Sequence, residues 1–323
     1  MSKKKYRFHW ICGEIRWFVI RVLHVILKKY YISKTKYGKS ELHSSEDGNK
    51  KLFELIHSGK SFALGRESFV EFDLLIRSRT KEYFGFSTLG LLKDMIKSFS
   101  SLGMDDAMKS LNKFVTLMED SIENMDVVGV WDSLAMADTY LDTVSGVDNR
   151  YITSAIVVEP YIFDNPWSKA LEGKKVLVVN PFYKEIQSQY DNVRDKIWKN
   201  PDILPEFELK AIDSVWFFAG QYDPRFTNRI EAIDYLYEQI MKEDFDIALL
   251  GCGAMGFPLA SMIKKAGKQA IHMGGCLQIM FGVKGSRWDN NGFGDKYYNE
   301  YWIRPGEDTK PKGASRLDAS CYW

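Results

Sequence analysis

Short apolar runs alternate with amphipathic segments along most of this chain. The runs are five or six residues long, as in strands that a parallel sheet buries on both faces. They lie at 61–65, 126–130, 175–179, 245–250 and 269–273, with one more strand expected within 207–218. Helical spacing covers 51–56, about 91–124, 225–242 and 257–266, and another helix follows the strand at 175–179. This alternation predicts an α/β fold, with a mostly parallel sheet flanked by helices.

The stretch 245–275 joins a strand, a glycine turn and a helix. Gly251, Gly253 and Gly256 have GxGxxG spacing directly between the strand and the helix, which is the context in which this spacing binds phosphate. The turn lets backbone N–H groups approach an anion, and the helix dipole favours negative charge there. A second glycine pair, Gly274 and Gly275, ends the next strand. We expect these glycines to form a cradle for a diphosphate.

Two features separate this turn from a dinucleotide-binding fingerprint. The fingerprint needs an acid about 20 residues further on, at the end of the next strand, to bind the ribose. Here that strand ends at His272 and Met273, and it is the only confident strand after the turn. A nucleotide with a single diphosphate needs neither the acid nor further strands. His272 could contact phosphate or transfer a proton near neutral pH, although a lone His at a strand end is more often structural.

A second candidate site follows the first strand. Arg66, Glu67 and Glu71 come directly after the run at 61–65, and a helix beginning there would place both carboxylates on one face of its first turn. Open α/β sheets bind ligands at this carboxyl edge. A carboxylate there can act as a base or hold a divalent ion. The alternative is that Arg66 pairs with one of the two acids and only stabilises the helix start.

Two further polar residues end predicted strands. Asn180 follows the run at 175–179, and Asp132 follows the run at 126–130. Asn180 either bonds to ligand or caps the next helix. Asp132 is a second-rank candidate for ligand contact.

The beginning of the chain differs from the rest in charge. Residues 1–39 hold eleven Lys and Arg and a single acid, Glu14. The apolar stretch 17–27 is interrupted by Arg21, so it falls short of the ~18–20 apolar residues that span a bilayer, and no signal-peptide cleavage site follows it. A basic amphipathic helix within residues 1–31 is typical of attachment to a membrane surface. The alternative is a helix that packs on the domain.

The polar stretch 32–50 is predicted to be a linker. We therefore divide the chain into a basic arm with its linker at 1–50 and a single α/β domain at 51–323. The net charge of +1 provides no reason to expect a nucleic-acid partner. Aromatic residues make up 14%, which suits stacking on sugars or bases and equally suits packing. The four cysteines lack metal-binding or paired spacing, which indicates a reduced, cytoplasmic protein.

Four segments together resemble the bacterial GT-D fold glycosyltransferases of polysaccharide biosynthesis. They are SFALGRESFVEFDLL, GKKVLVVNPF, FDIALLGCGAMGFPLA and GKQAIHMGGCLQIMFGVKGSRW, and the resemblance covers about residues 50–323. It implies a Rossmann-like domain that takes a sugar from a nucleotide-sugar donor and transfers it to a glycan or lipid-linked acceptor. In that family an Arg precedes a DXE motif that binds a divalent metal, Mn²⁺ or Mg²⁺, or the donor. Arg66 and Glu71 match the Arg and the final Glu, but Phe69 replaces the Asp.

The resemblance and the residue pattern together define the expected site. Glu71 and Arg66 are the expected catalytic residues, with Glu71 as the base for the acceptor hydroxyl or as a metal ligand. The residues expected to contact substrate are Gly65, Glu67, Asn180, Gly251, Gly253, Gly256, His272, Gly274, Gly275 and Lys284. The expected location is the cytoplasm, with attachment of the arm to the inner face of the cell membrane.

Two other functions fit the same sequence. One is a non-catalytic nucleotide-sugar-binding or scaffold protein of a polysaccharide-assembly complex, which the absence of Asp at position 69 favours. The other is a different glycan-modifying transferase, which moves a pyruvyl or phosphosugar group.

Overall fold

The structure is a computed structural model, and it describes most of the chain beyond residue 40. The described residues are 11, 15, 36–37, 40–67, 71, 74–75, 78, 104–131, 150–215, 217–218, 221–289, 292–306, 309–310 and 322–323. Phe69 and Asp132 lie outside them, as does nearly all of the basic arm. Ile11 and Ile15 are helical, and their side chains are 52% and 59% exposed. Within the described residues, no helix has both the length and the apolar character needed to cross a membrane.

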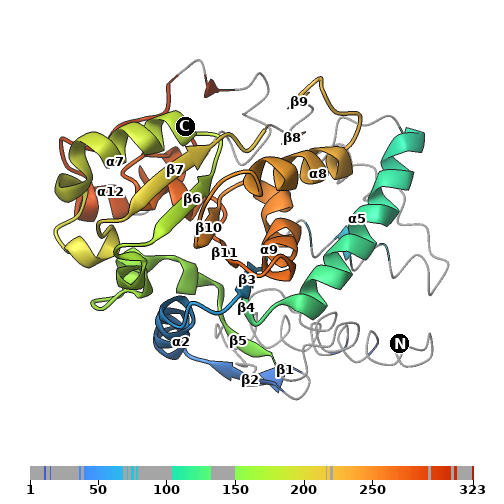
Figure 1. The fold of residues 1–323 in the computed structure, drawn as a ribbon, viewed down its shortest axis with the longest axis horizontal. Coiled ribbons are helices and arrows are strands. Elements are labelled where there is room, and N and C mark those ends of the chain that lie inside the picture. The colour runs from blue at the N-terminus through green and yellow to red at the C-terminus, as the bar shows by residue number, and fades with distance from the viewer. Residues whose placement is uncertain are drawn as a thin grey trace.

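A nine-stranded sheet runs through the described part of the chain (Figure 1). Its order is β1-β2-β5-β4-β3-β11-β10-β6-β7, and every neighbouring pair is parallel except β1 and β2. The strands are β1 Lys36–Tyr37, β2 Ser40–His43, β3 Phe62–Arg66, β4 Val127–Val130, β5 Tyr151–Ser154, β6 Lys175–Val179, β7 Glu208–Ile212, β10 Ile247–Leu250 and β11 Gln269–His272. A separate hairpin joins β8 Phe217–Phe218 to β9 Gln221–Tyr222. The predicted mostly parallel α/β sheet is confirmed.

Helices cover both faces of this sheet (Figure 1). They are α2 Ser45–His57, α5 Met104–Asn124, α7 Tyr183–Ile197, α8 Arg229–Ile240, α9 Gly256–Lys265, α10 Cys276–Met280, α11 Ser286–Asp289 and α12 Phe293–Tyr297. Short 3₁₀ turns are η1 Ala155–Val158, η2 Pro160–Ile162, η3 Trp167–Leu171, η4 Pro201–Ile203 and η5 Gly253–Met255. Helices α5, α8 and α9 pack together over one apolar core, and α2, α7 and α10 contribute to the other.

Strand β6 illustrates why continuous apolar runs predicted this sheet. Leu177 and Val179 lie in the core beneath α8 and α9, whereas Val176 and Val178 lie in the core beneath α7. Successive side chains of a strand point to opposite faces. A strand covered by helices on both faces must therefore be apolar at every position.

The linker predicted for residues 32–50 is wrong over residues 40–50, which form β2 and the start of α2. Strand β2 pairs with β5, with Leu42 opposite Ile152. The Ser44 hydroxyl then caps α2 by accepting a hydrogen bond from the Asp47 backbone N–H at 3.1 Å. The segment is polar because its strand lies near the sheet edge and the first turn of its helix faces solvent. Strand β5 is also absent from the strands that the apolar runs predicted.

Gly65 gives a first test of how closely the layers pack. A Cβ on Gly65 would overlap the ring of Phe257, a buried residue of α9. We expect Gly65→Ala to lower the free energy of unfolding by about 1–3 kcal/mol, the usual cost of overpacking a core. Urea unfolding measures this change. Adding Phe257→Leu should recover part of the loss by making room, and additive effects of the two substitutions would contradict the proposed overlap.

Candidate functional site

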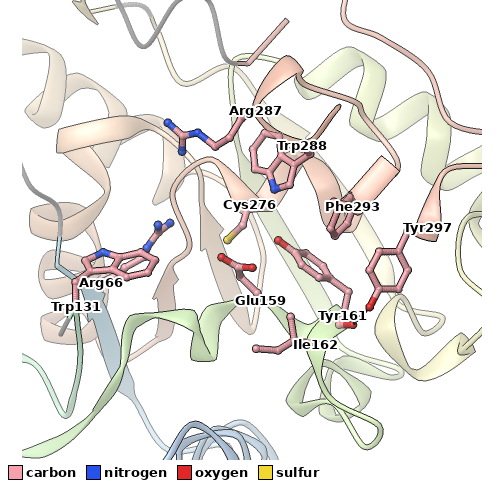
Figure 2. Close-up of a pocket in the computed structure, with 10 residues that line it drawn as sticks. All are labelled: Arg66, Trp131, Glu159, Tyr161, Ile162, Cys276, Arg287, Trp288, Phe293 and Tyr297. Atoms are coloured by element: carbon pink, nitrogen blue, oxygen red, sulfur yellow. Dashed lines mark hydrogen bonds between the residues drawn. The ribbon is translucent and has the colours of Figure 1, made fainter. Parts of the chain in front are cut away.

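A cavity of about 250 Å³ lies at the carboxyl edge of the sheet, beside the ends of β3, β4 and β11. Parallel strands bring their carboxyl ends to one edge, which is where open α/β sheets bind ligands. Figure 2 shows the side chains that line the cavity: Arg66, Trp131, Glu159, Tyr161, Ile162, Cys276, Arg287, Trp288, Phe293 and Tyr297. Of the predicted site residues, only Arg66 is among them.

Arg66 is held rigidly in the cavity wall. Its Nη1 donates a hydrogen bond to the Met273 carbonyl oxygen at 2.9 Å, and its guanidinium lies 4.9 Å from the centre of the Trp131 ring. The buried Nε–H of Arg66 has no hydrogen-bond partner within the described part of the chain. An unsatisfied buried donor is costly. The positive charge of the guanidinium would attract an anion in the cavity.

Glu67 holds Trp131 in place beside Arg66. The Glu67 carboxylate accepts a hydrogen bond from the Trp131 backbone N–H at 2.9 Å, and the Trp131 indole Nε1–H donates to the Glu67 carbonyl oxygen at 3.0 Å. Glu67 is 1% exposed. Glu67 was predicted to contact substrate. In the structure its hydrogen bonds support the Trp131 ring beside Arg66, and it does not line the cavity.

Glu159 contributes a carboxylate to the cavity, at the junction of η1 and η2 after β5. Burial raises the pKa of Glu159, while Arg66, the Tyr161 hydroxyl and Arg287 act to lower it. The Tyr161 hydroxyl and the Glu159 carboxylate lie toward one another (Figure 2). Burial also raises the pKa of Tyr161 well above its usual range, so the phenol stays protonated and can donate a hydrogen bond.

Cys276 is not equipped to be a nucleophile. Burial raises the pKa of its thiol to about 12, so the thiolate is absent at neutral pH. The sulfur also lies 3.0 Å from the Met273 carbonyl oxygen, to which the thiol donates. Its role in the cavity wall is that of a small apolar side chain.

Aromatic side chains form the opposite wall of the cavity. Trp288, Phe293 and Tyr297 come from α11 and α12 and lie across the cavity from Arg66 (Figure 2). The Tyr161 ring packs edge-on against Phe293, with 5.2 Å between ring centres, and is stacked on Trp198 at 5.4 Å. Such a wall provides apolar faces on which a sugar or base ring can lie.

The glycines of the predicted turn serve different purposes. A Cβ on Gly251 would overlap Asn180, and one on Gly256 would overlap the His272 ring, so both are needed for close packing. Gly253 is exposed, has a φ of +56° and has open space around its Cα. It is the member of the turn that fits direct approach of a ligand to the backbone.

The second glycine pair lies beside Arg66. Gly274 has a φ of +66°, and a Cβ there would be 3.0 Å from Nη1 of Arg66. A Cβ on Gly275 would overlap the Tyr322 ring. The fold therefore brings Arg66 and the Gly274–Gly275 turn together at one edge, although about 200 residues separate them in the chain.

Asn180 and His272 have structural surroundings. Asn180 is 2% exposed; its Nδ2 donates to the Gly251 carbonyl oxygen at 3.2 Å, and its Oδ1 accepts from the Phe182 N–H at 2.9 Å. Asn180 thus joins the glycine turn to the residues before α7. It does not cap that helix, whose N-cap residue is Phe182 without a side-chain cap, and its contact with ligand stays a prediction. Burial and then the charge of Arg66 lower the pKa of His272 to about 3. A neutral imidazole beneath Gly256 is a poor candidate for proton transfer.

Lys284 also lies apart from the cavity lining. Its Nζ is 5.0 Å from the centre of the Tyr298 ring, and its backbone N–H donates to the Ile303 carbonyl oxygen at 2.7 Å. The contact of Lys284 with substrate stays a prediction. None of its interactions with the described residues supports that contact.

Glu71 is enclosed rather than open to the cavity. It is 7% exposed, and burial raises the pKa of its carboxyl, with Arg229 and Arg66 acting to lower it. Arg229, near the start of α8, is also 7% exposed, and burial lowers its pKa to about 10. Glu71 therefore has a cationic neighbour, and it does not line the cavity.

The described residues around Glu71 do not fit a divalent metal ion. Two guanidinium groups act on its carboxylate, and a divalent cation would be repelled by both. No three His, Cys, Asp or Glu side chains come together as metal ligands in the part of the chain that the structure describes.

Glu159 and Tyr161 were missed in the sequence because strand β5 was missed. Polar residues that follow predicted strands are the candidates for ligand contact. Glu159 follows β5 after a single 3₁₀ turn, so without β5 it is not among them. The strand reads YITS, which has polar residues and no long apolar run. Arg287 lies within the segment GKQAIHMGGCLQIMFGVKGSRW, but nothing local distinguishes it from other surface arginines.

The fold and the site define a Rossmann-like α/β domain with a ligand cavity at the carboxyl edge of its sheet. No protein-family model and no curated protein matches the chain. Among solved structures, the chain is similar to a selenomethionine-substituted structure of domain of unknown function 1792 (DUF1792). The two share 12% identity over 83% of this chain and 96% of that chain, with a TM-score of 0.43. A likeness at this level does not carry over a function, so the site residues must indicate one.

Proposed function

We propose that this protein is a glycosyltransferase that moves a sugar from a nucleoside-diphosphate sugar to a hydroxyl group of a glycan or lipid-linked acceptor. One observation carries the proposal. A single cavity combines the guanidinium groups of Arg66 and Arg287, the carboxylate of Glu159 and a wall of aromatic rings. These are the groups that bind a phosphate, activate a hydroxyl and stack on a sugar.

Arg66 is suited to the phosphate that leaves with the nucleotide. Its orientation is set before ligand arrives, by Met273 and Trp131. A preorganised donor stabilises developing negative charge without the cost of reorganisation during the reaction. Gly274 leaves room beside Arg66. Gly253, in the other glycine turn, has an exposed backbone with open space around it. The diphosphate would extend along these two turns.

The size of the cavity suits one ring of the donor rather than all of it. Sites for drug-sized ligands are about 300–1,000 Å³, and this cavity has about 250 Å³. A single sugar ring would lie against Trp288, Phe293 and Tyr297. The nucleotide would lie outside, toward the glycine turns.

The resemblance of four sequence segments to GT-D fold glycosyltransferases supports the same reaction. It also supports a place in polysaccharide biosynthesis, in the cytoplasm or on the inner face of the membrane through residues 1–31. The enclosed position of Glu71 favours one alternative, a nucleotide-sugar-binding protein without catalysis, because the carboxylate of the early motif is not available to substrate.

Thermal shift with a panel of UDP-, GDP-, CMP- and dTDP-sugars, each with and without Mn²⁺, tests donor binding. We expect one nucleoside-diphosphate sugar to raise Tm without added Mn²⁺, since a ligand at 100 times its Kd stabilises the folded state by about 2.7 kcal/mol. The same donor should then be hydrolysed or transferred to a glycan acceptor. No shift with any donor would contradict the proposal, and binding without turnover would favour the non-catalytic alternative. Transfer of a pyruvyl or phosphosugar group would identify the other transferase.

A further inference from the structure

We infer that Glu159 is the general base of this transfer and accepts the proton of the acceptor hydroxyl. This inference rests on the proposed function and names a catalytic residue different from Glu71. Among the described residues that line the cavity, Glu159 is the sole acid. A base must reach the proton that it removes, so position is the first requirement.

The backbone on both sides of Glu159 is fixed. The Glu159 N–H donates to the Ile156 carbonyl oxygen at 2.9 Å, and the Glu159 carbonyl oxygen accepts from the Ile162 N–H at 3.3 Å. Pro160 follows directly and begins the next 3₁₀ turn, which restricts the chain further. The Glu159 side chain therefore projects from two short turns whose backbone is held, as a precisely placed catalytic group requires.

Burial makes Glu159 a stronger base than an exposed carboxylate. The groups that face it are Arg66, Arg287, the Tyr161 hydroxyl and the Cys276 thiol. Burial raises the pKa of Glu159 above the ordinary value of 4.5, and the two cations and the phenol limit the rise. Cys276 is neutral, because burial raises its pKa to about 12. A base is most effective when its pKa approaches the working pH.

The reaction step balances without a further reagent. Glu159 takes the proton from the acceptor hydroxyl as that oxygen attacks the anomeric carbon of the sugar. A new carbon–oxygen bond forms to the acceptor, and the bond from the anomeric carbon to the diphosphate oxygen breaks. The electron pair leaves with the nucleoside diphosphate, whose added charge Arg66 and Arg287 would neutralise. This single displacement inverts the anomeric configuration.

Glu71 provides the matched comparison. Both acids have a pKa raised by burial and both interact with Arg66. Glu159 lines the cavity, whereas Glu71 lies apart from it and interacts with Arg229. If position decides the base, the two neutral substitutions should differ in turnover.

The experiment compares Glu159→Gln with Glu71→Gln, using the nucleotide sugar that raises Tm in the panel above. We expect Glu159→Gln to lower kcat by about 10²–10⁴-fold, the usual contribution of general base catalysis, with donor binding within about threefold of the wild type. We expect Glu71→Gln to keep kcat within about tenfold in the folded fraction. A folded Glu159→Gln protein with near-normal kcat would overturn the inference.

The pH profile separates proton transfer from a structural role. A base works only when deprotonated, so kcat of the wild type should fall as the pH is lowered through the pKa of Glu159, which lies above 4.5. The residual activity of Glu159→Gln should lack this acidic limb, and formate should restore part of the activity of Glu159→Ala. An unchanged limb in Glu159→Gln would show that another group titrates.

The product anomer separates a base from a nucleophile. The single displacement that this base assists inverts the configuration at the anomeric carbon. NMR of the product, made from a donor of known anomeric configuration, measures whether the configuration has inverted. Retention would overturn the base role in a single displacement, and a sugar covalently attached to Glu159 would assign this residue as a nucleophile. The two proposals fail differently, since a wild type that neither binds nor turns over any nucleotide sugar contradicts the proposed function itself.

Discussion

Arg66→Ala is expected to lower kcat by about 10²–10³-fold, the usual loss when one preorganised donor for transition-state charge is removed. Donor binding should weaken as well, because hydrogen bonds to charged groups contribute about 1.5–3 kcal/mol. The reason is the position of Arg66 in the cavity wall, fixed by the Met273 carbonyl oxygen and by the Trp131 ring. Steady-state kinetics and calorimetric titration with the identified nucleotide sugar measure the two effects.

Two control variants make this result specific. Arg66→Lys keeps the charge but removes the planar guanidinium, and it should recover little activity, since an ammonium cannot both bond to Met273 and present a bidentate donor. Lys284→Ala removes a cation outside the cavity lining and should leave kcat within about threefold of the wild type. Equal losses in Arg66→Ala and Lys284→Ala would show that general positive charge, rather than this site, supports the reaction.

Arg229→Met is expected to lower the free energy of unfolding by about 3–5 kcal/mol, the cost of leaving a buried charge without the opposite charge that compensates it. Arg229 and Glu71 are each 7% exposed, and each shifts the pKa of the other toward the charged form. Without Arg229, the buried Glu71 carboxylate would lose the larger of the two cationic influences that favour its charged form, and Arg66 would supply the other. Urea unfolding measures the change.

A second substitution and a change of pH both test the cause. Adding Glu71→Gln to Arg229→Met should recover much of the lost stability, because no buried charge then remains. The pKa of Glu71 is already raised by burial, and loss of Arg229 raises it further. The folded state of Arg229→Met then binds more protons than the unfolded state, so its deficit should shrink as pH falls. A deficit independent of pH and of Glu71 would indicate lost packing instead.

The local sequence was sufficient for the sheet and for its glycine turns. A short continuous apolar run such as 175–179 is typical of a strand that helices cover on both faces of the sheet. Strand β6 has the same bounds. GxGxxG between a strand and a helix likewise predicted the turn at Gly251–Gly256. What failed were β2 and β5, whose polar residues match their positions toward the end of the sheet. These two strands lack the continuous apolar signal.

The groups that contact or neighbour each ionisable side chain could be identified only from the tertiary structure. Nothing near Glu71 in the sequence indicates that Arg229, more than 150 residues later, is its cationic neighbour. Nothing near Arg66 indicates Trp131 or Met273. Spacing can place Glu67 and Glu71 on a predicted helix, but it cannot tell which carboxylate is enclosed and which acid faces a cavity.

By itself, the sequence determined the α/β class, most strands of the sheet and the edge at which the candidate site lies, because hydrophobic periodicity and turn chemistry are local properties. Only the tertiary structure decided that Arg66 lines the cavity, that Glu67 and Asn180 support other groups, and that Glu159 lines the cavity whereas Glu71 does not. Burial and charge pairing arise between segments distant in the chain, so they exist only once the sheet has brought those segments together.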